Sequence, residues 1–590
     1  MNTQNFNTVT FDIECNGLTP DTIWVIVAKE FEGKTHTFSY DKKNIDEGIK
    51  FLQSKDTLIG HNIIGFDIPI IKKLYGVDLL EGKEIKDTLV LSQLFNPIRD
   101  GGHSLKIWGH RVGATKMTPP EEWDKFNPLM IPYCQTDVQV NELVYKTLMI
   151  EGKSFSKESI EIEHEVSKIL RQQESNGFYF DEKQARHFSA ELNKRKKEVT
   201  EEVQKVFKPK WVDVKLVTPK LKQDGELSKS GLTDEEYNKI LNLELSLMKD
   251  PYKPFMRQKL QEFNLGSRKQ IGEYLKDFGW KPNRFTPTGQ PIIDEATLNK
   301  VNHIPEAQLI SEFLLLQKRI AQINSWIDES KNNRVHGRVI STGTITNRMS
   351  HRSPNMAQVP NIGSPYGKEC RSCWTVPVGY KLVGIDASGL ELRMLAHYMN
   401  DPEYTNEIIH GDIHAKNQKT AGLKTRDNSK TFIYALMYGA GDAKIGAVVG
   451  GSKTTGKKLR KRFFDNQPSF KILRDRVISA SQRKFLKGLD GRKIYVRYEH
   501  ASLNTLLQSA GAIVMKMALV ILNTLAKESK LDYKFVANIH DEWQVEVKEE
   551  HAEEFGKLGV QAIRNAGRYF KLRCPLDGEY KIGEAWHETH

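Results

Sequence analysis

The chain has 590 residues and a mass of 67.6 kDa, which is enough for several domains with large cores. A formal net charge of +12 favours a polyanionic partner. The five cysteines, an odd number, argue against a disulfide-rich secreted protein and for a reducing, cytoplasmic setting. We expect no signal peptide and no membrane span, because no basic segment precedes an apolar run at the N-terminus and the most apolar run, residues 510–526, contains Lys516.

Residues 7–16 predict the first strand, because apolar and polar side chains alternate there. Asp12 and Glu14 are two residues apart, so both carboxylates project from one face of that strand. Adjacent carboxylates repel each other unless a metal ion lies between them. The alternative interpretation is an ordinary exposed strand face.

Three further residues extend this pattern. Asp67 precedes Pro69 in the sequence GFDIP, where it could also be a helix N-cap. Tyr133 and Asp137 are four residues apart, and they share a face of a helix that we expect to open after Pro132.

The order DxE, NxxxFD, YxxxD resembles the three motifs of the 3′→5′ proofreading exonucleases that carry four acidic residues and a tyrosine. The resemblance covers residues 1–150 and implies an RNase H-like exonuclease domain. It also implies that two divalent ions are held by four carboxylates, those of Asp12, Glu14, Asp67 and Asp137. Tyr133 would help to orient the attacking water. No 5′-nuclease domain is expected before this domain, since its first strand begins almost at residue 1.

Residues 151–330 predict a helical, charged region, with apolar residues at helical spacing in 161–174, 182–207 and 310–327. Within it, residues 205–231 are rich in lysine and interrupted by proline and glycine. We interpret this stretch as a short loop, and the alternative is a full docking domain.

Two carboxylates mark the ends of predicted strands in the C-terminal half. Residues 380–393, YKLVGIDASGLELR, read as a strand that ends at Asp386 and is followed by a helix. Residues 535–547, FVANIHDEWQVEV, read as a strand, a tight turn that contains Asp541, and a second strand. Two acids at two strand ends suit two Mg²⁺ ions that align a 3′-hydroxyl with a triphosphate.

Four side chains recur every fourth residue from 426 to 438 and therefore form one stripe on a helix: Arg426, Lys430, Tyr434 and Tyr438. Gly439 is a plausible helix stop. Two cations followed by a ring suit a nucleoside triphosphate, whose phosphates and base they would contact. The alternative is a solvated basic face with a structural tyrosine.

The segments DASGLELR, KTFIY…YGAG and HDE together resemble motifs A, B and C of the family A DNA polymerases, the polymerase I group, and most closely its bacteriophage replicative members. The resemblance implies an α/β and α+β multidomain protein in which the exonuclease domain is followed by a right-hand polymerase. The thumb would span residues 151–330, the palm 331–398 and 481–590, and the fingers 399–480.

The resemblance also implies residue roles. Asp386, Asp541 and the Ala387 carbonyl would hold two Mg²⁺ ions, with Mn²⁺ as an alternative. The incoming dNTP would meet His414, Arg426, Lys430, Tyr434 and Glu391, of which Lys430 takes part in catalysis and Glu391 excludes a ribose 2′-hydroxyl. The primer–template would meet Arg348, Asn355, Gln358, Tyr438, His500, Gln508 and His540. For Asn355 the alternative is a role in a structural Pro-Asn turn.

The predicted function is DNA-templated DNA synthesis on a primer 3′-hydroxyl with proofreading, in phage genome replication in the host cytoplasm. The expected partners are primer–template DNA and dNTPs, with a replisome helicase or primase, or a processivity factor, as a further partner. In some phage relatives such a factor docks on a thumb insertion, but the 211 residues between Asp137 and Arg348 favour a short thumb loop here.

Two alternatives remain open. A single-subunit RNA polymerase shares this palm, although the exonuclease motifs and Glu391 argue against it. A nuclease or DNA-binding protein with an inert polymerase half is disfavoured by the intact Asp386 and Asp541 pair. Comparing dNTP with rNTP incorporation tests the first alternative, and primer extension tests the second.

Overall fold

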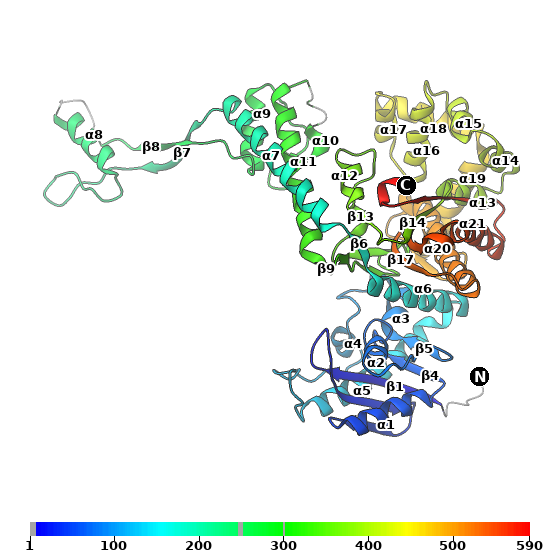
Figure 1. Ribbon diagram of the computed structural model, residues 1–590. Coiled ribbons are helices and arrows are strands. Elements are labelled where there is room, and N and C mark those ends of the chain that lie inside the picture. Colours follow the sequence, from blue (N-terminus) through cyan, green and yellow to red (C-terminus); the bar gives the residue numbers. More distant parts are fainter. Residues whose placement is uncertain (1–6, 246–251, 299–300, 302, 590) are drawn as a thin grey trace. The chain divides into compact units, whose positions relative to one another are not determined.

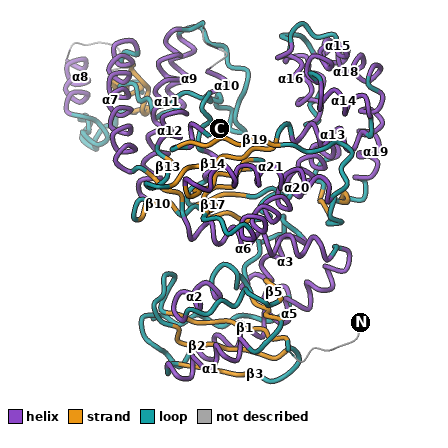
Figure 2. The backbone as a smooth tube through the Cα atoms, turned by 45° about the vertical axis from the view of Figure 1, so that its right-hand side comes forward, coloured by secondary structure: helices purple, strands orange, loops and turns teal. Residues whose placement is uncertain are grey.

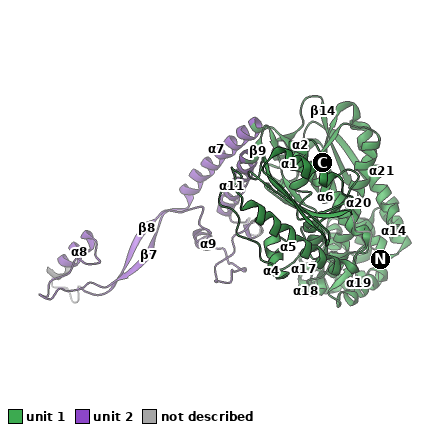
Figure 3. Ribbon diagram, turned by 90° about the horizontal axis from the view of Figure 1, so that it is seen from below, with its two compact units in different colours: residues 1–182, 329–590 green, residues 183–328 purple. Residues whose placement is uncertain are grey.

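The computed structural model describes all residues except 1–6, 246–251, 299–300, 302 and 590. The chain forms two compact units, of which one contains residues 1–182 and 329–590 and the other residues 183–328 (Figure 3).

The N-terminal part of the first unit is a five-stranded mixed sheet in the order β3-β2-β1-β4-β5 (Figures 1 and 2). β1 is antiparallel to β2 and parallel to β4, and β5 is parallel to β4. This is the RNase H-like arrangement that the sequence predicts. Its elements are β1 (Thr8–Cys15), β2 (Ile23–Glu30), β3 (Thr35–Ser39), α1 (Lys42–Gln53), β4 (Thr57–Gly60), α2 (Asp67–Tyr75), β5 (Glu84–Asp87), α3 (Thr88–Phe95), α4 (Leu105–Arg111) and α5 (Met130–Glu151).

The two faces of this sheet are covered by different helices, because side chains alternate along β1. Phe11 and Ile13 share a core with the apolar residues of α1 and α2. On the other face, Val25 and Val27 of β2 pack against α5. Asp12 is the register partner of Val27 and Glu14 that of Val25, so both acids lie on the face that α5 covers.

The C-terminal part of the first unit is built on an antiparallel sheet in the order β17-β18-β14-β19. Its strands are β14 (Tyr380–Ala387), β17 (Tyr533–Ile539), β18 (Glu542–Lys548) and β19 (Gly578–Gly583). α21 (Ala552–Tyr569) packs on β14 and β19, α6 (Lys157–Asn176) packs on β17, and α20 (Ser502–Glu528) contacts both helices.

Shorter elements surround this sheet. A second four-stranded sheet has the order β13-β6-β10-β9, and two hairpins pair β11 with β12 and β15 with β16. The bounds are β6 (Phe178–Phe180), β9 (Ser330–Lys331), β10 (Arg334–Val335), β11 (Arg338–Ile340), β12 (Ser350–Arg352), α12 (Gly367–Ser372), β13 (Trp374–Thr375), β15 (Phe485–Lys487) and β16 (Lys493–Tyr495).

Seven consecutive helices run between β14 and the β15–β16 hairpin, and they gather above the central sheet in Figure 1. They are α13 (Leu390–Met399), α14 (Pro402–His410), α15 (Ile413–Ala421), α16 (Arg426–Met437), α17 (Asp442–Val448), α18 (Lys453–Asn466) and α19 (Pro468–Ser481). Their apolar faces and those of α20 and the central sheet form one continuous core.

By length and composition α20 could cross a membrane, and it is the one such helix among the described residues. However, 78% of its most apolar window is buried inside the protein. The helix therefore serves as a core helix here, as the sequence predicts for residues 510–526.

The second unit is largely helical. Its elements are α7 (Glu182–Val206), β7 (Lys210–Val217), α8 (Asp234–Leu245), β8 (Phe255–Gln261), α9 (Arg268–Asp277), α10 (Glu295–Leu298) and α11 (Pro305–Glu329). The first residue of α7 and the last residue of α11 belong to the first unit. Arg195 of α7 donates from Nε to Glu312 of α11 at 2.7 Å. The prediction of a short loop at residues 205–231 was wrong: β7 and β8 pair as an antiparallel ribbon, because the alternating Val, Leu and Trp residues of β7 suit a strand.

Four fully buried charged residues connect three segments of the first unit that are far apart in the sequence. Glu163 of α6 accepts from Lys516 Nζ of α20 at 2.6 Å and from Arg492 Nη1 at 2.5 Å. Arg492 also donates from Nε to Asp490 at 2.8 Å, within the turn between β15 and β16. Burial on its own would raise the pKa of Glu163, but the charges of Lys516 and Arg492 bring it down to about 2.

We predict that Glu163→Gln destabilises the protein by about 3–5 kcal/mol at pH 7, because it leaves two buried cations with one acid. The ionised Glu163 stabilises the wild type above its unfolded pKa of 4.5, and this stabilisation is lost as the pH falls towards about 2. The difference between variant and wild type should therefore shrink below pH 4.5, by at most about 1.4 kcal/mol per pH unit.

Urea unfolding of both proteins between pH 7 and pH 3.5 measures this difference. Glu165→Gln is the control, because Glu165 lies on the exposed side of α6 and forms an ion pair with Lys168 at the surface. A penalty that stays constant over this pH range would contradict the assignment of the ionised form.

Candidate active sites

Asp386 and Asp541 come together because β14 and β18 are neighbours in the central sheet. Asp386 pairs in register with Glu542, and the Ala387 amide donates to the Asp541 carbonyl at 3.1 Å. The predicted strand, turn and strand around Asp541 is confirmed: β17 and β18 are joined by two residues, and His540 takes a φ of 58° there. Both predicted metal ligands thus lie at one edge of the sheet, where the end of β14 meets the start of β18.

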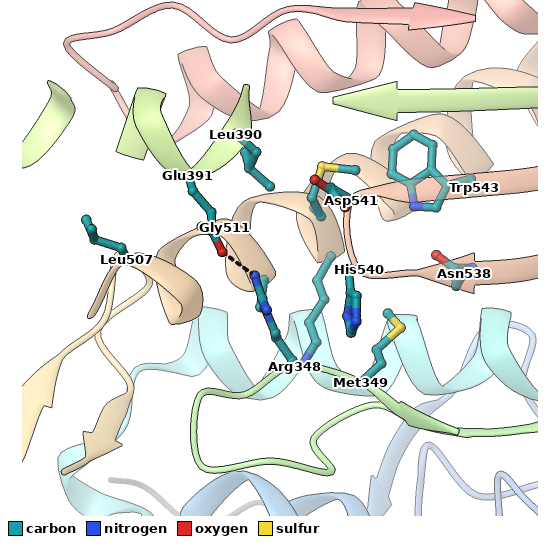
Figure 4. A pocket seen from close by; sticks show the side chains of 13 residues that line it. Arg348, Met349, Leu390, Glu391, Leu507, Gly511, Asn538, His540, Asp541 and Trp543 are labelled. Atoms are coloured by element: carbon teal, nitrogen blue, oxygen red, sulfur yellow. Dashed lines mark hydrogen bonds and ion pairs between the residues drawn. The ribbon is translucent and has the colours of Figure 1, made fainter. Parts of the chain in front are cut away.

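A pocket lies against this edge, and Figure 4 shows Arg348, His540 and Asp541 beside one another in it. Burial raises the pKa of Asp541, while the charges of Arg348 and His540 oppose that rise. Asp541 is a half-buried carboxylate with a raised pKa, and it lies next to a second carboxylate and to the backbone at Ala387. Together these oxygen atoms are a suitable ligand set for a hard divalent cation.

Glu391, in the first turn of α13, joins Arg348 of this pocket to Tyr438 at the end of α16. Its carboxylate accepts from Arg348 Nη2 at 2.8 Å and from the Tyr438 hydroxyl at 2.8 Å. Burial raises the pKa of Tyr434, and the charges of Glu391 and Asp541 add to the rise. Glu391 therefore hydrogen-bonds to Tyr438, while Tyr434 lies nearby, with a ring centroid 6.1 Å from that of Tyr438.

The predicted stripe on α16 faces away from the core. Arg426, Lys430 and Tyr438 are exposed and Tyr434 is half-buried, whereas the remaining apolar residues of α16 are buried. Gly439 ends the helix with a φ of 71°, and a Cβ atom there would lie 1.9 Å from the His500 carbonyl oxygen. The expected helix stop at Gly439 is therefore confirmed.

The cations of the stripe lie near His414. Arg426 donates from Nε to Asp412 at 2.7 Å, and Asp412 caps α15 by accepting from the amides of His414 and Ala415. Burial lowers the pKa of His414, and the charges of Arg426 and Lys430 lower it further. Two cations and a neutral imidazole thus share one surface, which suits an anion.

The other predicted DNA-contacting residues are less closely grouped. The Asn355 side chain accepts from the Ala357 amide at 3.2 Å and caps the turn Met356–Gln358, which fits the structural alternative. Gln358 is exposed, and His500 is exposed and stacks on Tyr498 with ring centroids 5.5 Å apart. Gln508 is half-buried on α20, next to Leu507 of the pocket.

A second cluster of acids lies in the N-terminal domain. Ligand atoms of Asp12, Glu14 and Cys134 lie within 4.8 Å of one another. Asp67 lies beside β1, where its Oδ1 accepts from the Ile13 amide at 3.1 Å. Asp67 is the first residue of α2 and not its N-cap, and α5, which carries Asp137, begins at Met130 and not after Pro132. A proline is compatible with the first turn of a helix.

These acids favour a bound cation. Burial raises the pKa of Asp12 to about 7 and that of Glu14 to about 10, and the neighbouring carboxylates add to both shifts. Asp137 Oδ1 is buried without a hydrogen-bond partner among the described residues. Four converging carboxylates with an unsatisfied oxygen suit divalent metal ions.

Lys116 is a residue of this cluster that the sequence did not indicate. Its ammonium forms an ion pair with Asp137 and lies 5.1 Å from the centroid of the Tyr133 ring. Lys116 belongs to an irregular loop between α4 and α5, and no periodicity relates it to the acids. Only the folded path of that loop brings it to the carboxylates.

Comparison with known proteins agrees with this architecture. A sequence model of DNA polymerase family A matches residues 236–588. The DNA-directed DNA polymerases of Enterobacteria phage T3 and Escherichia phage T7 are each 34% identical over 90% of this chain and 92% of their own. A solved POL domain of Pol1 from M. smegmatis, in complex with DNA primer-template and dNTP, shares the fold with a TM-score of 0.77 over 98% of this chain and 95% of its own, at 16% identity. The chain belongs to DNA polymerase family A and is a DNA-directed DNA polymerase of the bacteriophage type.

Proposed function

We propose that this polymerase replicates a phage genome in the host cytoplasm by two-metal nucleotidyl transfer, and that its N-terminal domain proofreads the product as a 3′→5′ exonuclease. The observation that carries the proposal is the presence of two separate carboxylate clusters, Asp386 with Asp541 and Asp12 with Glu14, in different domains of one chain. Family membership argues against the RNA polymerase alternative.

We assign residues 1–150 to the exonuclease domain, 151–330 to the thumb, 331–398 and 481–590 to the palm, and 399–480 to the fingers. The compact unit of residues 183–328 supports a separate thumb. The run of helices from α14 to α19 supports the fingers.

In the palm, Asp386, Asp541 and the Ala387 carbonyl would hold two Mg²⁺ ions. Bound there, the ions would lower the pKa of the primer 3′-hydroxyl and stabilise the charge on the leaving pyrophosphate. His414, Arg426 and Lys430 would bind the triphosphate, and Lys430 would remain next to the reacting phosphate.

Beside the triphosphate, the ring of Tyr434 would stack on the base, and Glu391 would occupy the space of a ribose 2′-hydroxyl. The hydrogen bonds of Glu391 to Arg348 and Tyr438 hold its carboxylate in one orientation, which supports a role as a steric gate.

In the exonuclease domain, four carboxylates would hold two divalent ions, namely those of Asp12, Glu14, Asp67 and Asp137. The ions would supply an activated hydroxide. Tyr133 lies one helical turn before Asp137 on α5, where its hydroxyl would orient the attacking water.

The expected partners are primer–template DNA and dNTPs, which are the ligands named for the M. smegmatis POL domain. The primer–template would contact Arg348, Asn355, Gln358, Tyr438, His500, Gln508 and His540. A processivity factor or a replisome helicase or primase is a further proposed partner. The β7–β8 ribbon offers it a surface, because Trp211 and Leu260 are paired across the ribbon and are 67% and 54% exposed.

The proposal predicts two separable activities. Asp12→Ala with Glu14→Ala should abolish digestion of a single-stranded 3′ end and leave primer extension near the wild-type rate, because the two clusters lie in different domains. Asp541→Asn should stop extension while digestion persists. Both are measured on one labelled primer, with and without template. Loss of extension in the Asp12/Glu14 variant would contradict the proposal of two separate active sites.

A second prediction concerns Lys116 and metal binding. In EDTA the ammonium of Lys116 compensates part of the repulsion between the exonuclease carboxylates, so Lys116→Met should melt at a lower temperature than the wild type. Added Mn²⁺ should raise the melting temperature of the variant more than that of the wild type, because the ion takes over that compensation.

Differential scanning fluorimetry measures both shifts, with Lys42→Met, an exposed lysine of α1, as the control. If Mn²⁺ shifts the melting temperature of Lys116→Met and the wild type equally, the ammonium and the ion do not compensate the same charges.

A further inference from the structure

A groove runs between the N-terminal domain and the C-terminal part of the same compact unit. One wall is the turn that leads to Asp67, including Asn62 and Gly65. The other wall is formed by α6 and by the β11–β12 hairpin, and it carries three arginines: Arg171, Arg338 and Arg352.

Two of these arginines face each other. Arg338 of β11 and Arg352 of β12 are register partners, so their side chains leave the hairpin on the same face. Like charges directly opposite each other destabilise a hairpin. Among the residues that the structure describes, neither guanidinium forms an ion pair; Arg338 is half-buried and Arg352 is exposed. The pair therefore presents ten N–H donors to whatever enters the groove.

The third arginine adds to this positive charge, and the two acids of the groove already have partners. Arg171 is 3.2 Å from Glu174 through Nη1, but its Nε is buried without a hydrogen-bond partner among the described residues. The other acid, Asp87, already accepts from the amides of Asn62, Ile64 and Leu89. With both acids engaged, the uncompensated charge in the groove is positive.

The hairpin also lies next to both carboxylate sites. The turn that forms the opposite wall leads directly to Asp67, a proposed exonuclease ligand. Arg348 and Met349, the two residues that precede β12, line the pocket of the palm together with Asp541. A DNA strand that passes from one site to the other would cross this hairpin.

We propose that the Arg338–Arg352 pair, together with Arg171, binds the phosphodiester backbone of single-stranded DNA, namely the frayed 3′ end of the primer on its way to the exonuclease carboxylates. The assignment rests on the proposed proofreading function. Because the two arginines are paired directly across the hairpin, their guanidinium groups can contact neighbouring phosphates of one strand, and each can bind a phosphate through two N–H donors.

The test is binding of a 5′-labelled oligothymidylate in EDTA, followed by fluorescence anisotropy over a range of NaCl concentrations. Arg338→Ala with Arg352→Ala should lower the affinity several-fold and reduce the slope of log K against log salt by about 1.4, because two phosphate contacts to a single strand are lost. Arg338→Lys with Arg352→Lys keeps both charges and should keep most of the slope, which separates loss of charge from misfolding.

The matched control is Lys42→Ala with Lys43→Ala, which removes the same charge from the exposed start of α1 and should leave the slope unchanged. A fully paired primer–template with a matched end should bind the alanine variant as tightly as the wild type. Unchanged single-strand binding would overturn the proposal. Equal weakening on the matched duplex would also overturn it, because the arginines would then belong to the duplex path.

This experiment is independent of the exonuclease activity, because binding is measured without metal. One outcome is that the wild-type protein does not digest single strands in Mg²⁺ while the Arg338/Arg352 variant shows the reduced salt slope. The proofreading function is then contradicted, and the assignment of the groove to single-strand binding stands. If the wild-type protein digests single strands but the variant has an unchanged salt slope, the assignment of the groove is contradicted and the proofreading function stands.

Discussion

The antiparallel ladder between β14 and β18 holds Asp386 beside Asp541, and the polymerase site depends on it. Two half-buried carboxylates repel each other, so no side-chain contact between them would keep them close. The backbone does so because the residues behind them are buried: Val383 and Ile385 of β14 and Trp543 and Val545 of β18 belong to one core. The hydrophobic burial of these strands offsets the electrostatic cost at their ends.

The exonuclease cluster meets the same constraint with different compensation. There the acids lie between β1 and α5, and the ammonium of Lys116 pairs with Asp137. In the palm, Arg348 and His540 take the corresponding part beside Asp541. The two sites are built on different sheets with separate cores, so we expect a substitution in one cluster to leave the packing of the other unchanged.

Local pattern was enough to predict much of this structure. The alternation of residues 7–16 predicted β1, and the four-residue spacing from Arg426 to Tyr438 predicted the exposed face of α16. Both depend only on the geometry of one element. Local pattern could not predict three features that join distant segments, because loop paths and helix packing decide which segments come together. They are Lys116, the Arg338–Arg352 pair and the Glu163–Lys516–Arg492 cluster. The β7–β8 ribbon was missed because its prolines and glycines flank strands that pair across an intervening helix. For Asn355 the sequence pattern allowed two interpretations, a DNA contact and a turn cap, and local pattern alone could not choose between them.

The central claim is that strand pairing makes Asp386 and Asp541 one metal site for nucleotidyl transfer. Its most direct test is the number of Mn²⁺ ions, measured by electron paramagnetic resonance, that the Asp12→Ala with Glu14→Ala protein binds on a dideoxy-terminated primer–template with the matching dNTP. We predict two tightly bound ions per complex and the loss of at least one after the further change Asp386→Asn. The same number of ions with and without the Asp386 carboxylate would contradict the account.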